Sequence, residues 1–328
     1  MTHRRWHWVA MVAALLMLCV IALGTGAIHI EPGAVVAALQ GSGDPGVVSI
    51  IRNLRLPRIL LAALVGAGLG MSGGALQGTL RNGLAEPYLL GVSGGAAVGA
   101  VIAFGLHATS AGIIGLSAFA GAAGAVVLAL LVARASGSVG RGDPRTLLMA
   151  GVVIGAFANA IIMIALANAP PNTIRGALWW MMGSVADTSW SAVMWLSAYI
   201  AGAGAALVYW AREIDILSLG DESAAALGVN VEVAARRMYL LAALLAASTV
   251  AAAGLIGFVG LIVPHIVRAT GIRHHRPLVI AAGLVGAALL VGADLVARTA
   301  RPPGELPLGA VTAVLGVPFF LVQLRKAR

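Results

Sequence analysis

The sequence contains an apolar segment, PRILLAALVGAGLGMSGGALQGTL at residues 57–80, that is long enough to cross a membrane as a helix. Its glycines recur every four residues, a spacing that places them along one stripe of a helix. They are Gly66, Gly70, Gly74 and Gly78. Small residues at this spacing let two membrane helices approach closely. The stripe therefore predicts tight helix packing, which many membrane proteins share, and it does not by itself indicate transport.

The composition of the whole chain is typical of a membrane protein. Of its 328 residues, 60% are apolar and only 10% are charged, and the mean hydropathy is +0.97. A soluble domain would have about a quarter of its residues charged, so the composition excludes a soluble enzyme. The high hydrophobicity also excludes a disordered chain. Cys19 is the single cysteine, which leaves no internal disulfide framework and no cysteine-rich metal site.

We predict an all-α polytopic membrane protein with about ten transmembrane helices in a single domain, residues 1–328. The apolar segments are 8–28, 57–80, 88–106, 111–133, 147–169, 189–211, 238–254, 256–269, 278–297 and 306–324. The eighth segment is short and contains Gly257, Gly260 and Pro264, so we expect a broken or partial crossing there.

The charges predict the orientation. The net charge of +9 comes from arginines that lie mostly between the apolar segments, and basic loops mark the cytoplasmic side of a membrane. Placing both termini in the cytoplasm puts most of the basic residues inside. A soluble protein this basic would suggest nucleic acid, but the sequence has no basic stripe or stacking module. We therefore expect contacts with membrane lipid and none with nucleic acid.

A polar turn separates the second and third apolar segments. Residues 80–88 read LRNGLAEPY, in which Asn82 and Gly83 favour a turn and Pro87 is well placed to open a helix. From the residue types alone, this stretch is typical of a capped loop.

Several motifs, in order and at matching spacing, closely resemble the permease family of ABC importers for iron–siderophores, haem and vitamin B12, the type II importers. The motifs are RLPR at 55–58, NGLAEP at 82–87, LGVSGG at 90–95, SLG at 218–220, ALGV at 226–229, GFVGLIVPHIVR at 257–268, ELPLG at 305–309 and PFF at 318–320. The resemblance covers nearly the whole chain. It is highly specific for the family and poorly specific for the substrate.

The resemblance implies a fold of ten transmembrane helices and a homodimer around a central pathway in a bacterial inner membrane. Two ATP-binding subunits would hydrolyse ATP-Mg on the cytoplasmic side, and a substrate-binding protein would deliver the cargo from outside. The cargo would be a metal chelate, with an iron–siderophore as our first expectation and haem or cobalamin close behind. The chain has no phosphate-binding loop of its own. We therefore expect a permease with no catalytic residues, no permanently bound cofactor and no metal site.

The resemblance also assigns two cytoplasmic features. Asn82 and Leu84 match the family's cytoplasmic gate, whereas Asp143-Pro144-Arg145-Thr146 departs from the small hydroxyl pair expected at a second gate. The loop 212–237 would couple the permease to the ATPase through a short helix near 219–227. Its coupling residues would be Ser218, Leu219, Gly220, Asp221, Glu222, Leu227 and Gly228. Ser218 and Asp221 have capping-box spacing, and Gly228 lies where a helix would end. By composition alone this would be a solvated loop.

On the outer side, the family places a short helix at the mouth of the pathway. Here Arg175, Trp179 and Met182 would line it, and Arg175 could pair with a carboxylate of the cargo. The alternative is an interfacial arginine that meets lipid phosphate or water. His265 is expected to serve packing or gating, because its motif occurs in the family whatever the cargo.

Two further sets of charges lie near the outer side. Asp294 and Arg298 have i,i+4 spacing, which favours a self-neutralising pair. Arg52, Arg55, Arg58, Glu31 and Glu305 are candidates for contact with the binding protein.

Two other classes of function are alternatives to an importer permease. An ion-coupled secondary transporter acting without an ATPase usually keeps acidic residues in the membrane, and Asp294 is the main residue of that kind. An intramembrane enzyme would need a paired nucleophile and base or a metal cluster, and the sequence contains neither pattern.

Overall fold

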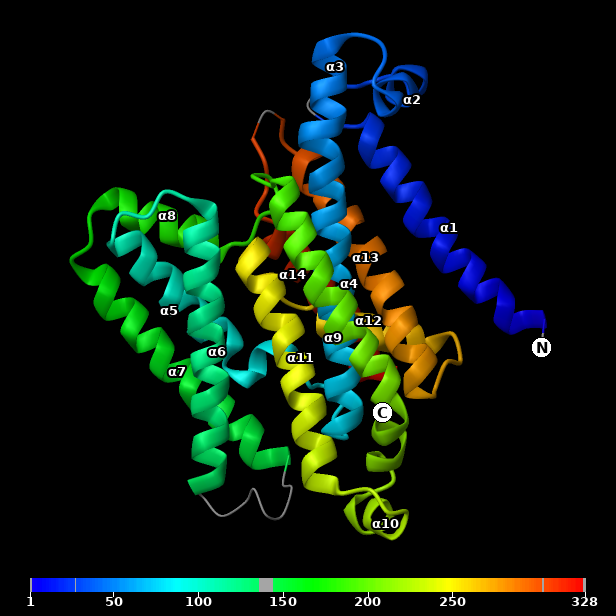
Figure 1. Cartoon of the computed structure of the whole chain (residues 1–328), viewed down its shortest axis with the longest axis vertical. Coiled ribbons are helices and arrows are strands. Elements are labelled where there is room, and N and C mark those ends of the chain that lie inside the picture. Colours follow the sequence, from blue (N-terminus) through cyan, green and yellow to red (C-terminus); the bar gives the residue numbers. More distant parts are fainter. Residues whose placement is uncertain (1, 27, 136–143, 303, 327–328) are drawn as a thin grey trace.

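The computed structural model describes residues 2–26, 28–135, 144–302 and 304–326, and these residues form helices joined by short connections (Figure 1). In chain order the elements are α1 (Thr2–Gly24), α2 (Pro32–Gln40), α3 (Pro45–Ser49), a π-helical turn (Ile50–Arg55), α4 (Leu56–Thr79), a 3₁₀ turn (Pro87–Leu90), α5 (Val92–Gly105), α6 (Ala111–Ala135), α7 (Pro144–Ala167), α8 (Pro171–Met181), α9 (Trp190–Leu217), α10 (Asp221–Ala226), α11 (Val231–Ala253), α12 (Val259–Ala269), α13 (His275–Thr299) and α14 (Leu308–Lys326).

Every apolar segment predicted from the sequence contains a helix. Within the described residues, seven helices are long and apolar enough to cross a membrane, and three apolar helices are shorter. The shorter ones are Val92–Gly105, Val259–Ala269 and Leu308–Phe319. The all-helical architecture is therefore confirmed, with seven clear membrane-spanning candidates and three helices of lesser length.

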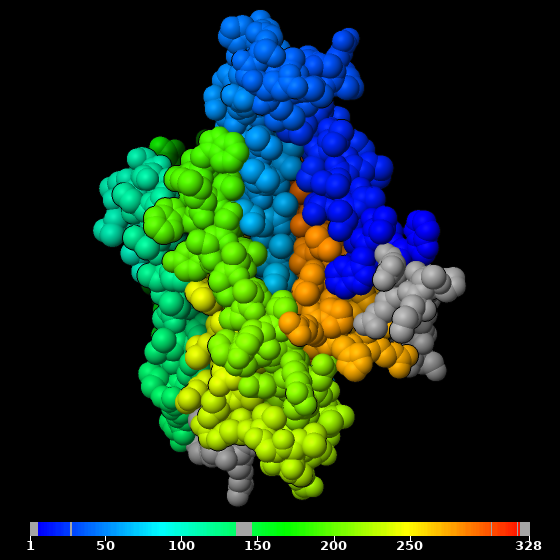
Figure 2. Space-filling view, turned by 45° about the vertical axis from the view of Figure 1, so that its right-hand side comes forward, coloured from blue at the N-terminus to red at the C-terminus, as the bar shows by residue number. Residues whose placement is uncertain are grey.

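Helix α4 occupies the centre of the molecule (Figure 1). It packs against α9, α11, α12 and α13, while α5, α6, α7 and α8 form a second group to one side. Two buried apolar clusters follow this division. One lies around α4, α9 and α13, and the other joins α5 and α6 to α11. Helix α1 lies along the outside against α13, as Figure 2 also shows.

The predicted glycine stripe on α4 is the surface that meets α13. A Cβ atom added at Gly66 would lie 2.1 Å from the carbonyl oxygen of Gly286, and one at Gly70 would lie 2.3 Å from that of Ala282. One at Gly78 would lie 2.2 Å from the imidazole of His275. Real Cβ atoms cannot approach so closely, so the two backbones are in contact only because these positions lack side chains.

The second helix of the chain is longer than a bilayer requires. The residues of α3, the π-helical turn and α4 form one continuous helix, Pro45–Thr79, of 35 residues. At about 1.5 Å per residue it spans roughly 52 Å, well beyond the ~30 Å hydrocarbon core. Its N-terminal part packs with α2 at the end of the molecule opposite α10 (Figures 1 and 2).

Two predicted helices start later than the sequence suggested. The segment 88–106 begins as a 3₁₀ turn, and its α-helix starts only at Val92, after Gly91 with a φ of +79°. In the segment 256–269 the backbone is irregular up to Phe258, which is left-handed, and the helix starts at Val259. The predicted partial crossing is therefore α12, which the irregular residues 254–258 separate from α11. Irregular backbone inside a membrane protein must be enclosed by protein, and both interruptions face each other.

We predict that Gly66→Ala lowers the stability of the protein by about 1–3 kcal/mol, the range typical of overpacking, because α4 and α13 must separate. Gly202→Ala in α9 is the matched control, since an added Cβ there meets nothing within 4 Å. Thermal unfolding of both variants in the same detergent measures the difference. Equal melting temperatures for the two variants would contradict this account of the stripe.

Candidate functional site

Helix α10 forms the tip of one end of the molecule (Figure 1). Its Ala224 is buried against Leu217 of α9 and Ala234 of α11, which anchors the helix to the body. Leu219 and Leu227 flank the helix and are 63% and 60% exposed. Two exposed leucines therefore lie on either side of α10, next to its polar residues Asp221, Glu222 and Ser223.

The structure confirms the short helix predicted near 219–227, with bounds Asp221–Ala226. Gly228 ends it in a left-handed conformation with a φ of +81°, as its position suggested. The predicted capping box is wrong. Gly220 precedes the helix without a side-chain cap, and the Ser218 hydroxyl donates to the Asp215 carbonyl oxygen at 2.6 Å.

The segment predicted as the coupling loop, 212–237, is mostly helical. Helix α9 continues to Leu217 and α11 starts at Val231, so irregular backbone is confined to the residues on either side of α10. The charged side chains hold these helices together. Asp215 accepts the backbone N–H of His275 at 2.9 Å and meets its Nδ1 at 2.7 Å. It therefore caps the N-terminus of α13, where the helix dipole favours a negative charge.

A second ion pair joins α9 to α11. Arg237 of α11 donates to Glu213 of α9 at 2.8 Å, and its guanidinium stacks over Trp210, 4.6 Å from the ring centre. Glu213 and Asp215 therefore fix α9, α11 and α13 to one another. Glu222 differs from them, because it lies exposed on α10.

The predicted gate residues lie on the turn that follows α4. The Asn82 side chain accepts the backbone N–H of Leu84 at 2.9 Å, and the Asn82 carbonyl oxygen accepts that of Ala85 at 3.0 Å. This arrangement holds Leu84 outward, where it is exposed. His265 of α12 stands beside the turn, and its Nδ1 lies 2.9 Å from the Leu261 carbonyl oxygen. Asn82 thus shapes the turn and Leu84 projects from it. Of the second gate, Asp143 lies outside the described residues, and Pro144 begins α7.

The turn leads into a junction with the interrupted segment before α12. The Glu86 carboxylate accepts the backbone N–H of Phe258 at 2.8 Å, and the Tyr88 hydroxyl accepts that of Ile256 at 2.9 Å. Phe258 immediately precedes α12 and has a left-handed φ of +69°. Glu86 therefore satisfies an N–H group that the broken helix leaves without a backbone partner.

Nothing in the residues around Glu86 and Tyr88 predicts these contacts, because their partners lie 172 and 168 residues further along the chain. Gln77 completes the junction. Its amide nitrogen donates to the Leu261 carbonyl oxygen at 3.1 Å, and its oxygen accepts from Arg268 at 2.5 Å.

The residues predicted for the substrate pathway share one face of α8. Arg175, Leu178, Trp179 and Met182 are all exposed and recur at helical spacing. Backbone hydrogen bonds tie the end of this helix to the start of α14, because Met182 and Gly183 accept the N–H groups of Gly309 and Leu308 at 3.0 and 3.1 Å. Trp179 also lines a hollow of about 540 Å³ that Phe104 and Glu305 border.

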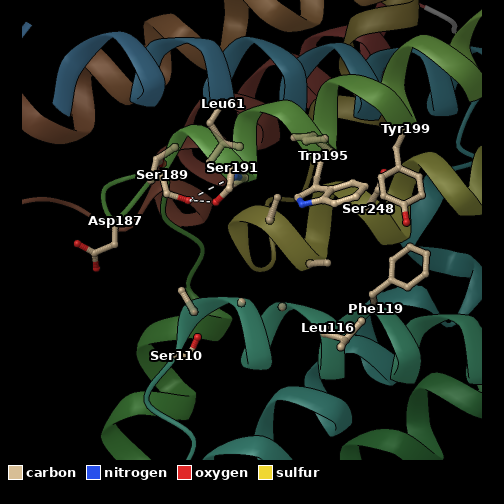
Figure 3. Close-up of a pocket in the computed structure, with 18 residues that line it drawn as sticks. Leu61, Ser110, Leu116, Phe119, Asp187, Ser189, Ser191, Trp195, Tyr199 and Ser248 are labelled. Atoms are coloured by element: carbon tan, nitrogen blue, oxygen red, sulfur yellow. Dashed lines mark hydrogen bonds between the residues drawn. The ribbon is translucent and has the colours of Figure 1, made fainter. Parts of the chain in front are cut away.

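A larger groove of about 760 Å³ lies between α6 and α9 (Figure 3). Ser110, Asp187 and Ser189 stand at one end of it, and Trp195, Tyr199 and Phe119 lie further in. Phe119 and Tyr199 are in ring contact, with centroids 5.7 Å apart. None of the residues predicted for the gate, coupling or pathway lines this groove.

A network of buried charges holds the outer parts of α1, α4 and α13 together. Arg58 donates to Asp294 at 2.8 Å and to both oxygens of Glu305 at 2.7 and 2.9 Å. The predicted pair of Asp294 and Arg298 is present at 3.6 Å, but Arg58 is the closer partner. Asp294 is only 2% exposed. Its charge is therefore neutralised inside the structure.

Two arginines of this network hold the end of α1. Arg298 donates to the Ala22 carbonyl oxygen at 2.9 Å, and Arg55 donates to those of Leu23 and Ile28. Cations are favourable at a helix C-terminus, where carbonyl groups lack backbone partners. The expectation that Arg55 and Arg58 face a binding protein is wrong, because both side chains are turned inward. Arg52, Glu31 and Glu305 remain exposed candidates, although Glu305 also bonds to Arg58.

In the described part of the chain, no three His, Cys, Asp or Glu side chains come together in a way that could hold a metal ion.

Comparison with known proteins identifies the family. The FecCD transport family profile matches residues 14–326. The Fe(3+)-citrate import system permease protein YfmE of Bacillus subtilis is 38% identical over 95% of this chain and 92% of its own length. The hemin transport system permease protein HmuU of Yersinia pestis is 37% identical over 96% and 94%. The cobalamin import system permease protein BtuC of Halobacterium salinarum is 42% identical over 84% and 73%.

A solved structure has the same fold. It is described as an inward-facing conformation of a transporter of the metal-chelate ABC type, with a TM-score of 0.87 and 29% identity over 97% of this chain and 98% of the other. The chain is thus a multi-pass permease of the ABC transporter class. It belongs to the FecCD transport family. It is not an enzyme, and ATP hydrolysis resides in a separate partner subunit.

We expect Glu86→Ala to destabilise the protein by about 1–3 kcal/mol, the cost of leaving a buried N–H group without a partner. Glu86→Gln keeps an acceptor oxygen at the same place and should cost less. Thermal unfolding of the purified variants measures both effects. If the two substitutions cost the same, the hydrogen bond to Phe258 is not what Glu86 contributes.

The charge network yields a second expectation. Arg58→Met leaves Asp294 buried with only the more distant Arg298, and breaking a buried pair costs about 3–5 kcal/mol. The double variant Arg58→Met/Asp294→Asn removes both charges and should regain part of that stability. Denaturation of the parent, both single variants and the double variant measures the coupling. Additive effects would show that Arg58 and Asp294 do not stabilise each other.

Proposed function

We propose that the chain is the transmembrane subunit of an ATP-driven importer that carries a metal chelate across a bacterial inner membrane. Two copies form a homodimer, two ATP-binding subunits bind to the α10 end in the cytoplasm, and an extracytoplasmic binding protein delivers the cargo at the opposite end. Both termini are cytoplasmic, and the seven long and three short apolar helices make ten crossings. An iron chelate is the first candidate for the cargo, with haem and cobalamin close behind. The relatives reported above are named as permeases for Fe(3+)-citrate, hemin and cobalamin.

The observation that carries this proposal is the exposed apolar tip at α10. Leu219 and Leu227 are 63% and 60% exposed on either side of this short helix. A protein partner that buries both would account for two exposed leucines placed together on a helix that is anchored to the body. The coupling residues 218–222, 227 and 228 all belong to this tip.

The cargo path is best placed between two copies of the chain. Helix α4 fills the centre of a single copy and is in backbone contact with α13, which leaves no channel there for a bulky chelate. The exposed face of α8 supplies Arg175, Trp179 and Met182 for the outer mouth of the path. An arginine there suits a carboxylate-bearing chelate, which it can bind through two parallel hydrogen bonds.

Transport follows an alternating-access cycle in which this chain provides the moving walls. The ATP-binding subunits displace α10, and the turn at Asn82 and Leu84 opens or closes the cytoplasmic end of the path. Leu84 is the blocking side chain, since Asn82 is occupied in holding the turn through its hydrogen bond to the Leu84 N–H.

The ion-coupled alternative loses its main support. Asp294, on which it depended, is buried and bonded to Arg58. A carboxylate held in this way stabilises the structure and is poorly placed to bind and release an ion with each cycle.

The test is native mass spectrometry of the tagged chain, extracted gently from its own membrane. Two copies with two ATP-binding subunits are expected, and iron or cobalt analysis of the same sample identifies a retained chelate. A chain that is reproducibly free of an ATP-binding subunit across several mild detergents would overturn the proposal.

We further predict that Leu219→Ser/Leu227→Ser weakens binding of the ATP-binding subunit roughly hundred-fold, since burying each leucine contributes about 1.5 kcal/mol or more. Co-purification and titration with the isolated ATP-binding subunit measure the loss. Leu39→Ser is the control, because Leu39 is an exposed leucine on α2 at the opposite end. Unchanged binding by the double variant would exclude the α10 tip as the docking site.

A further inference from the structure

An ion pair connects the predicted gate turn to α10. Arg81 lies two residues after the end of α4 and precedes Asn82, and its Nη2 donates to a carboxylate oxygen of Asp221 at 2.7 Å. Asp221 is the first residue of α10. The two residues are 140 positions apart in the chain, so this contact joins two segments that the backbone connects only through several helices.

The backbone at Arg81 shows that the side chain matters there. The end of α4 has the hydrogen bonds of a Schellman motif, in which Arg81 N–H donates to Gly78 at 3.3 Å and Asn82 N–H donates to Gln77 at 3.1 Å. The residue at the position of Arg81 adopts a left-handed conformation and is usually glycine. Arg81 has a φ of +49°. An arginine here accepts a backbone conformation that costs free energy, and glycine would avoid that cost.

Stability does not explain this arginine. The side chains of Arg81 and Asp221 are 33% and 42% exposed, and exposed ion pairs contribute only about 0–1 kcal/mol. What the pair does supply is a direct link between α10 and the turn. The other contacts of α10 lead elsewhere, because Ala224 packs against Leu217 of α9 and Ala234 of α11. Gly220, with a φ of +106°, precedes α10, and glycine is the least restricted backbone residue.

We propose that the ion pair between Arg81 and Asp221 is the strut that carries movement of α10 to the gate turn within one subunit. When the ATP-binding subunit displaces α10, Asp221 pulls or pushes the guanidinium of Arg81, and the adjoining Asn82 and Leu84 follow. Arg81 and Asp221 are positioning residues, since they act through the turn and not on the cargo. This inference rests on the proposed function, which supplies both the driving subunit and the gate.

The test separates ATP hydrolysis from gate movement and needs no identified cargo. In a Cys19→Ser background, spin labels at Gly83→Cys in the turn and Arg276→Cys at the start of α13 report the gate distance by double electron–electron resonance. Both positions are exposed. The permease is reconstituted with its ATP-binding subunit in nanodiscs and measured without nucleotide and with ATP-Mg and vanadate.

Three variants are compared with the labelled parent. Arg81→Gly removes the strut while suiting the left-handed backbone, so misfolding of the turn is not expected. Arg81→Asp/Asp221→Arg exchanges the two charges, so that an ion pair can still form between the turn and α10. Arg273→Gln removes an exposed arginine of the same end, between α12 and α13, and serves as the control.

If the ion pair transmits movement to the turn, ATP hydrolysis continues in Arg81→Gly while the nucleotide-dependent change in gate distance is lost. The exchanged pair then regains that change, and the control behaves as the parent. A full gate response in Arg81→Gly would overturn the strut and leave the proposed function standing. A parent that hydrolyses ATP with no change at the turn would instead overturn the proposed gate, and the strut with it.

Discussion

The contact between α4 and α13 depends on the absence of side chains along one stripe. At Gly66 and Gly70 the backbone of α4 lies so close to the carbonyl groups of α13 that a single methyl group has no room. In a membrane, apolar side chains gain little by leaving lipid for protein, so close backbone packing becomes a principal source of association. The pair of helices that results is the frame of the molecule. Helices α9 and α11 pack on α4, α1 packs on α13, and Asp215 fixes the start of α13 to α9.

The frame makes it possible to interrupt other helices. The irregular residues before α12 and the turn before α5 would each leave N–H groups without partners, and the membrane interior supplies no water to compensate. Here they face one another. Glu86 and Tyr88 accept N–H groups of the interrupted segment, and Gln77 of the central helix bonds to α12. The irregular backbone is thus enclosed by protein next to the turn that carries Asn82 and Leu84. A segment that is held by a few side-chain hydrogen bonds can change position more readily than a continuous helix, and this suits a gate.

The charged residues show how far residue types can be interpreted without a structure. The spacing of Asp294 and Arg298 correctly predicted that they pair, because four residues along a helix is one turn. The same logic could not find Arg58, which is 236 positions away and is the closer partner. Of the five acids between 212 and 237, Glu213 and Asp215 fix neighbouring helices and Asp221 bonds to Arg81. Glu222 is exposed on α10 beside the exposed leucines. The capping box predicted for Ser218 and Asp221 is absent at the start of α10. Gly220 precedes that helix without a side-chain cap, and Ser218 bonds to Asp215 instead.

The sequence by itself determined the class of protein, the segments that contain the apolar helices, the glycine stripe and the region of α10. These features depend on composition and on spacing along a single helix, which local geometry converts directly into structure. Only the tertiary structure decided which face the stripe meets, how Glu86 reaches the broken helix, which arginines turn inward, and that Arg81 bonds to Asp221. Each of these contacts joins residues far apart in the chain. Their formation depends on how the helices pack in three dimensions, and no local pattern of residues records it.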